Sequence, residues 1–154
     1  MSQDAPDLPC LCTALRRASR SVTAAYDEAL RPTGLRITQF ALLRTLARTG
    51  PVAVTRLAAE IALDRSTMGR NLDPLERRGL VRLSVGERDQ RERVAALTEA
   101  GTAAIASALP HWRTIQARLA AGEAAALARQ AAEIAAEAAA LQAALTAPMP
   151  PKSS

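Results

Sequence analysis

Residues 63–81 have the sequence LDRSTMGRNLDPLERRGLV, which predicts the helix around which the rest of the fold is arranged. Its apolar side chains recur at i, i+4 and i+7, as expected for one buried helical face, at Met68, Leu72 and Leu75. The helix is predicted to start at about Asp64 and to end at Gly79. An interior proline loses a hydrogen bond, so a bend is expected at Pro74.

The opposite face of this predicted helix is polar, and it carries Arg65, Ser66, Thr67, Arg70, Asn71 and Arg77. A helix fits the major groove of DNA, where arginine can pair with guanine and asparagine with adenine, while hydroxyl groups bind phosphates or bases. The same residues also suit the solvated face of an ordinary surface helix. The polar face alone therefore leaves both interpretations open.

The neighbouring segments decide between them. A short helix that carries Leu57 and Ile61 is predicted just before Asp64, with Thr55 as its N-cap and as a further DNA contact, which makes a helix-turn-helix. After it, residues 80–85 and 93–97 are short and rich in β-forming residues, and the charged turn 86–92 lies between them. This hairpin can place guanidinium groups in a narrow minor groove, from Arg88, Arg91 and Arg93. The sequence therefore predicts a winged helix-turn-helix.

Helices are predicted on both sides of this lobe, so the fold class is mainly α with a small β-hairpin wing. Residues 98–147 are alanine-rich, with expected breaks at Pro110 and at Ala121-Gly122. Such helices cannot form a compact domain alone, so they are expected to pack against the first helix and a second subunit. The predicted organisation is an N-terminal dimerisation helix, a DNA-binding lobe, C-terminal dimerisation helices and a flexible tail, at residues 7–33, 34–97, 98–147 and 148–154.

Charge and composition agree with this organisation. The chain has 154 residues and a net charge of +5, and residues 31–97 hold thirteen arginines against seven acidic residues, while both flanks are close to neutral. A basic patch between neutral flanks indicates a polyanion such as double-stranded DNA. No signal peptide or membrane-spanning stretch is recognisable, so a cytoplasmic protein without a membrane partner is expected.

The sequence closely resembles the multiple-antibiotic-resistance regulator (MarR) family in three places: residues 63–81, DQR at 89–91 and LTEAG at 97–101. The resemblance spans residues 15–119 and implies a homodimer that holds two winged lobes apart for a pseudo-palindromic site. It also implies that Arg91 enters the minor groove and that Asp89 holds it. Proteins of this kind usually repress nearby genes, and they release DNA when a small phenolic or lipophilic ligand binds or when a cysteine is oxidised.

Two cysteines, Cys10 and Cys12, lie close to the start of the chain. Cys12 is predicted early in the first helix, where the macrodipole favours a thiolate, and Arg16 follows one turn later as a thiolate partner. The plainer alternatives are a small buried residue for either cysteine, or an exposed bystander for Cys10.

The surroundings of Cys12 also resemble the organic-hydroperoxide sensors of the MarR family. That resemblance implies a reactive thiol at Cys12 and a tyrosine that contacts it, matched here by Tyr26. The position of a second tyrosine in those sensors holds Ile37. A hydroperoxide effector is therefore one hypothesis for regulation.

His111 and Trp112 lie where a family member's ligand pocket can be lined, although ordinary packing is the commoner role for such a pair. One histidine and two neighbouring cysteines fall short of a tetrahedral metal site, and no cofactor is expected.

Two other classes of protein are alternatives to a DNA-binding regulator. A thiol-dependent peroxidase would use Cys12, but the sequence lacks a Cys-x-x-Cys motif, a phosphate-binding loop and an acid-base set. A winged-helix interaction module for protein or RNA would not need Arg70 or Arg91.

Overall fold

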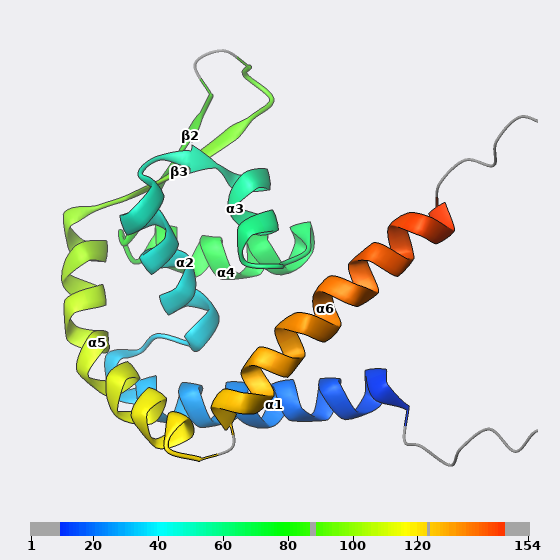
Figure 1. Ribbon diagram of the computed structural model, residues 1–154. Helices are drawn as coiled ribbons and strands as arrows, with labels where there is room; N and C mark the ends of the chain where they lie inside the picture. Colours follow the sequence, from blue (N-terminus) through cyan, green and yellow to red (C-terminus); the bar gives the residue numbers. More distant parts are fainter. Residues whose placement is uncertain (1–9, 87–88, 123, 147–154) are drawn as a thin grey trace, which may run out of the picture. The chain divides into compact units, whose positions relative to one another are not determined.

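The computed structural model describes residues 10–86, 89–122 and 124–146, and the chain divides into two compact units after Ile115. The predicted tail 148–154 lies outside the described residues. The elements, labelled in Figure 1, are α1 (Leu11–Leu30), the 3-10 helix η1 (Arg31–Thr33), α2 (Ile37–Thr49), β1 (Val52–Ala53), α3 (Val54–Glu60), α4 (Arg65–Arg77), β2 (Val81–Val85), β3 (Arg93–Leu97), α5 (Glu99–Ala120) and α6 (Ala124–Thr146). The mainly helical class with a hairpin wing is confirmed.

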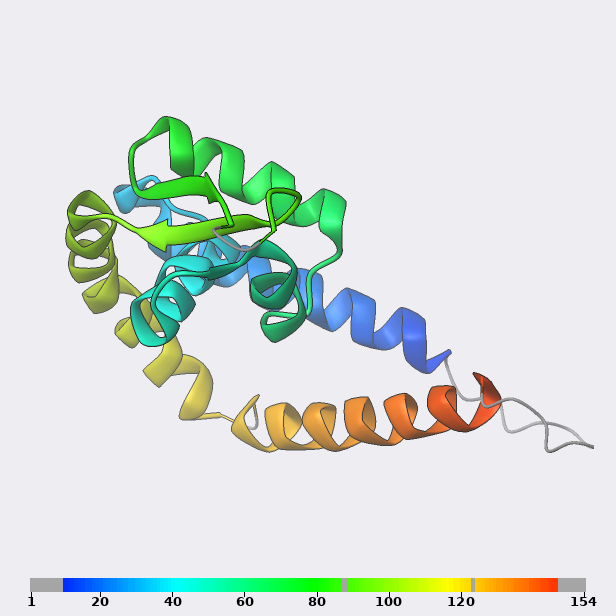
Figure 2. The same cartoon turned by 90° about the horizontal axis from the view of Figure 1, so that it is seen from above.

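The first unit contains one small antiparallel sheet with the strand order β1-β3-β2. The hairpin of β2 and β3 has the predicted position, and Figure 2 shows its two strands side by side. The sequence did not predict β1, because two residues are too short for an alternating pattern. β1 adds the third strand by pairing Val52 with Ala95.

The core of the first unit lies beneath this sheet, between α2, α3 and α4. The predicted apolar face of α4 is buried there, with Met68, Leu72 and Leu75 at most 2% exposed. Phe40 and Leu57 bring side chains of α2 and α3 into the same cluster. Burying a leucine or phenylalanine side chain contributes about 1.5–3 kcal/mol, so this cluster is what holds the helix-turn-helix together.

Two predictions about helix boundaries were wrong. Thr55 does not cap α3, because the chain passes directly from β1 into a helix that begins at Val54, and Thr55 is its exposed second residue. Pro110 does not break α5, which runs through it to Ala120. The helix packs on the core both before and after this proline, at Ala108 and Trp112, and that packing outweighs one lost hydrogen bond. The break predicted at Ala121-Gly122 is confirmed.

The start of α5 is joined closely to the end of α4 by Thr98 and Gly101. The Thr98 hydroxyl donates to the carbonyl oxygen of Gly79 at 2.7 Å and accepts the backbone N–H of Gly101 at 3.0 Å. A Cβ atom on Gly101 would lie 2.2 Å from the carbonyl oxygen of Leu80. Only glycine permits this approach, which fixes α5 against the lobe.

In the second unit, α6 is a helix rich in alanine. Its large apolar side chains are exposed at Leu127, Leu141 and Leu145.

Candidate nucleic-acid interface

The polar face predicted for α4 is exposed in the structure. Ser66, Arg70 and Arg77 follow one another at i, i+4 and i+11 along one exposed stripe, because these spacings return to the same side of a helix. Arg65 is exposed at the first turn, and Thr67 and Asn71 are half-buried at the edge of the stripe. All six side chains predicted on this helix are thus exposed or half-buried, and three of them share one stripe.

The first turn of α4 is organised by Asp64, its N-cap residue, which the sequence analysis placed at the helix start without a role in the interface. The Asp64 carboxylate accepts the backbone N–H of Thr67 at 2.9 Å. It also accepts both neighbouring hydroxyl groups, Ser66 at 2.7 Å and Thr67 at 2.6 Å. These donors, led by the Thr67 hydroxyl, hold the pKa of Asp64 well below its usual range. An aspartate three residues before a helical hydroxyl was the signal for this arrangement.

Two further side chains of α4 are oriented by the same turn. The Arg70 guanidinium lies 3.5 Å from the Ser66 hydroxyl and 3.4 Å from the Thr67 hydroxyl. Asn71 donates to the carbonyl oxygen of Thr67 at 2.8 Å, one turn earlier. Hydrogen bonds therefore connect the first half of the polar face, from Asp64 to Asn71.

The wing presents Asp89, Arg91 and Arg93, all exposed, whereas Arg88 lies outside the described residues. The Asp89 carboxylate accepts the backbone N–H of Arg91 at 2.9 Å. Across the described part of the chain, neither of the two ion pairs involves Arg91. Asp89 thus fixes the main chain at Arg91, and no carboxylate among the described residues forms an ion pair with the Arg91 guanidinium.

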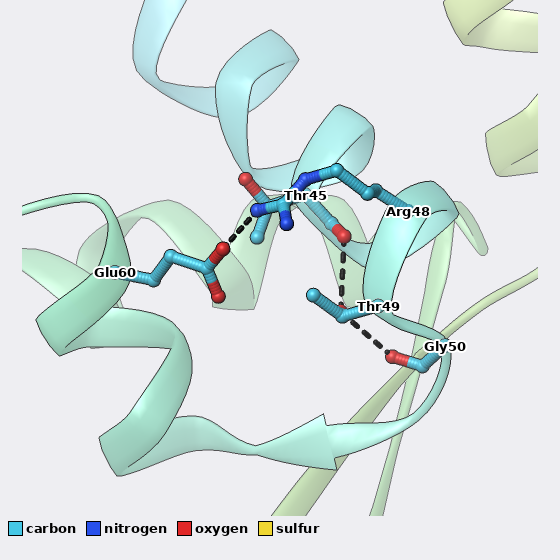
Figure 3. Close-up of polar contacts among 5 residues, drawn as sticks. All are labelled: Thr45, Arg48, Thr49, Gly50 and Glu60. Atoms are coloured by element: carbon cyan, nitrogen blue, oxygen red, sulfur yellow. Dashed lines mark hydrogen bonds and ion pairs between the residues drawn. The ribbon is translucent and has the colours of Figure 1, made fainter.

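α3 is tied to α2 by an ion pair between Arg48 and Glu60, shown in Figure 3. Beside it, the single hydrogen of the Thr49 hydroxyl is shared between the carbonyl oxygens of Thr45 and Gly50, at 3.0 and 3.1 Å, where α2 ends. The ion pair joins the last turn of α2 to the helix that precedes α4, and the Thr49 contacts lie within the end of α2.

The two cysteines are exposed at the start of α1. Cys10 is the N-cap residue, and hydrogen bonds from the backbone and side chain of Thr13 lower the pKa of its thiol. The Arg16 guanidinium approaches the Cys12 sulfur at 3.9 Å, as the spacing predicted. Tyr26 is half-buried further along α1, and burial raises its pKa. Fourteen helical residues span about 21 Å, so the same helix does not bring Tyr26 to Cys12.

A surface pocket of about 360 Å³ lies along α2 and includes Trp112 among its lining residues. The Arg44 guanidinium carbon lies 4.6 Å from the Trp112 ring centroid and 5.8 Å from that of Phe40. The two rings are themselves 6.1 Å apart. His111 is half-buried next to Trp112 in α5 but does not line this pocket.

No helix among residues 10–86, 89–122 and 124–146 is long and apolar enough to cross a membrane. Within the same ranges, no three side chains of the metal-binding types are grouped.

Comparison with known proteins agrees with this geometry. The MarR family model matches residues 35–92. The Staphylococcus aureus HTH-type transcriptional regulator MgrA is 33% identical over 90 residues, which are 58% of this chain and 61% of MgrA, so the match spans less than two thirds of that relative.

Solved structures extend the similarity over most of the chain. The M. tuberculosis transcriptional regulator MosR has been solved in complex with DNA, and it is 39% identical to this chain. The two structures match with a TM-score of 0.77 over 86% of this chain and 98% of MosR. A probable transcriptional regulator from Pseudomonas aeruginosa is 29% identical, with a TM-score of 0.71 over 80% of this chain and 96% of its own. With its winged helix-turn-helix and these matches, the chain belongs to the MarR family of transcription regulators.

Proposed function

We propose that this chain is a cytoplasmic transcription repressor that binds double-stranded DNA as a homodimer, with α4 in the major groove and the wing in the adjacent minor groove. The observation that carries the proposal is the exposed stripe of Ser66, Arg70 and Arg77 on α4. The similar regulator MosR has been solved in complex with DNA, which supports the same partner for this chain.

The charges of the lobe support a DNA partner. Arginines of α4 and of the wing take part in neither ion pair found among the described residues. Their charges are therefore available to phosphates, and this predicts affinity that falls steeply as salt is raised. An arginine bonded to a base edge would add sequence preference.

A homodimer is supported by apolar side chains that lie exposed on the two terminal helices. In α1 these are Leu11, Leu15 and Val22, and in α6 Leu127, Leu141 and Leu145. Exposed apolar faces of this kind mark association surfaces. Residues 7–33 and 98–147 would then serve dimerisation, and residues 34–97 would bind DNA. Two symmetry-related lobes would bind a pseudo-palindromic operator.

Two regulatory inputs, that is, signals that would release the chain from DNA, are candidates. The first is oxidation of the cysteines. The acidic Cys10 thiol and the contact between Arg16 and Cys12 support it, since a thiolate is the form that attacks a peroxide. Attack of a Cys12 thiolate on an organic hydroperoxide would give a sulfenic acid and release the alcohol. If Tyr26 takes part, a second copy of the chain must supply it.

The second candidate input is a small phenolic or lipophilic ligand in the pocket at Trp112. Its aromatic walls and the Arg44 guanidinium suit an aromatic compound that carries a negative charge. Trp112 is the chain's single tryptophan, so its fluorescence would report such a ligand directly. Neither input requires catalytic turnover, and we propose that the chain is not an enzyme.

The test is binding of the purified chain to the intergenic DNA beside its own gene, at fixed salt, by fluorescence anisotropy. Arg70→Ala and Arg91→Ala should each weaken binding by about 1–3 kcal/mol, the value of a base contact. Arg113→Ala, which removes an exposed arginine of α5 outside the lobe, is the matched control and should bind almost as the wild type does. Equal losses in all three variants, or no sequence preference in the wild type, would contradict the proposal. Repeating the measurement after hydroperoxide, and again after thiol, separates the two inputs.

A further inference from the structure

We propose that Asp64 is a positioning residue that makes Ser66 and Thr67 hydrogen-bond acceptors toward DNA, so that the first turn of α4 selects base amino groups and discriminates against phosphates and guanine. The inference rests on the proposed function, because it concerns how α4 recognises a major groove. It adds a residue and a direction of hydrogen bonding that the polar stripe alone does not give.

The hydrogen bonds at Asp64 have a fixed polarity. An ionised carboxylate can only accept hydrogen bonds, so the Ser66 and Thr67 hydroxyls must be the donors in their contacts of 2.7 and 2.6 Å with it. Each hydroxyl has a single hydrogen. That hydrogen is therefore already used, and neither hydroxyl has one left to donate to a ligand.

The lone pairs of the two hydroxyl oxygens remain available. A hydroxyl oxygen has two of them. The guanidinium of Arg70 takes up at most one on each oxygen, at 3.5 Å from Ser66 and 3.4 Å from Thr67, both long for a hydrogen bond. Since Ser66 is exposed and Thr67 is half-buried, each oxygen keeps acceptor capacity toward solvent or DNA.

DNA presents hydrogen-bond donors to such acceptors at only a few positions. In the major groove the hydrogen-bond donors are the amino groups of cytosine N4 and adenine N6, whereas guanine presents only acceptors. Phosphate oxygens are acceptors as well. Acceptor-only hydroxyls therefore favour amino groups, and they oppose phosphate oxygens and guanine. The negative charge of Asp64 works in the same direction, because it repels phosphates next to the helix N-terminus.

The decisive variant is Asp64→Asn. Asparagine is as good an N-cap as aspartate, so the helix should be retained. Its side chain has one acceptor oxygen in place of two and brings a donor of its own, which frees a hydroxyl hydrogen. The matched control is Asp73→Asn, which removes the same charge from an exposed position nine residues further along the same helix.

The experiment starts with selection of bound duplexes from a random library by the wild-type chain, followed by Kd measurements at fixed salt on the selected and a scrambled duplex. Each selected cytosine or adenine is then replaced by the analogue that lacks its amino group. For the wild type, at least one replacement should weaken binding about tenfold, within the range of a base contact. Asp64→Asn should lose that sensitivity and bind the scrambled duplex more tightly, while Asp73→Asn should keep it.

The outcomes separate the two proposals. A wild-type chain that selects no sequence defeats the proposed function itself. A wild type that binds specifically, but has the same amino-group sensitivity as Asp64→Asn, overturns this inference alone. Equal changes in Asp64→Asn and Asp73→Asn overturn it too, because charge would then suffice. If Asp64→Asn does not fold, as judged by circular dichroism, the Ser66→Ala, Thr67→Val double variant decides: with Asp64 present it should lose the same sensitivity, and retention overturns the inference.

Discussion

The guanidinium of Arg78, the residue that follows α4, donates a hydrogen bond of 2.8 Å to the carbonyl oxygen of Gly34. A second, longer contact of 3.5 Å reaches the carbonyl oxygen of Thr33. Gly34 has a φ of +67°, a conformation that glycine adopts without strain, and it ends η1 just before α2. One side chain thus joins the end of the proposed recognition helix to the turn that follows α1.

We expect Arg78→Ala to lower the free energy of unfolding by about 1 kcal/mol, because two backbone carbonyls lose their protein donor but remain close to water. Urea denaturation followed by circular dichroism measures the change. Arg82→Ala, which removes an exposed arginine of β2, should alter stability by less than about 0.5 kcal/mol. Equal effects of the two substitutions would show that the Arg78 contact contributes nothing.

Two glycines in helices should respond to alanine in opposite directions. At Gly101 a Cβ atom would overlap the Leu80 carbonyl oxygen at 2.2 Å, and backbone cannot yield as a flexible side chain can, so Gly101→Ala should cost at least about 1–3 kcal/mol. At Gly69 nothing lies within 4 Å of the added carbon, and Gly69→Ala should stabilise the helix by roughly 0.5–1 kcal/mol. Thermal unfolding of both variants checks this pair, and a destabilised Gly69→Ala would argue against the open space next to that residue.

The ion pair of Arg48 and Glu60 should contribute little to stability in spite of its position between α2 and α3. The Arg48 side chain is 66% exposed and that of Glu60 31%. Exposed pairs are worth about 0.2–1 kcal/mol, and salt screens them. A double-mutant cycle with Arg48→Ala and Glu60→Ala, measured at low and high salt, should give a coupling in this range that shrinks with salt. The same cycle with Arg44 in place of Arg48 should give no coupling, and a salt-independent coupling for the first pair would contradict the account.

Cys10 should be alkylated at a lower pH in the folded chain than in the unfolded chain. Hydrogen bonds from Thr13 lower its pKa, so the reactive thiolate is populated at a lower pH in the folded state and this preference disappears on unfolding. The measurement is the pH profile of iodoacetamide labelling, by mass spectrometry, in a Cys12→Ser variant with and without urea. Identical profiles in the two states would rule out activation of this thiol by the start of α1.

The sequence was sufficient to predict the winged helix-turn-helix, because Met68, Leu72 and Leu75 mark a buried face and glycines mark the helix ends. It failed where tertiary contacts decide. β1 forms only because β3 is available for pairing, and α5 continues through Pro110 because residues on both sides are packed on the core.

The candidate site also has some features that local spacing predicts and others that it does not. The polar face of α4 follows from helical spacing alone, whereas the hydrogen bonds of Asp64 depend on side-chain rotamers that no spacing contains. The contact of Arg78 with Gly34 joins residues 44 positions apart, and no local pattern predicts such a pair.

The central claim, that α4 occupies the major groove and the wing the minor groove, is tested most directly by methylation interference on a selected operator. Dimethyl sulfate modifies guanine N7 in the major groove and adenine N3 in the minor groove. We predict interference at both kinds of site, with loss of specific major-groove positions in Arg70→Ala and of minor-groove positions in Arg91→Ala. Interference confined to one groove, or unchanged patterns in both variants, would contradict the account.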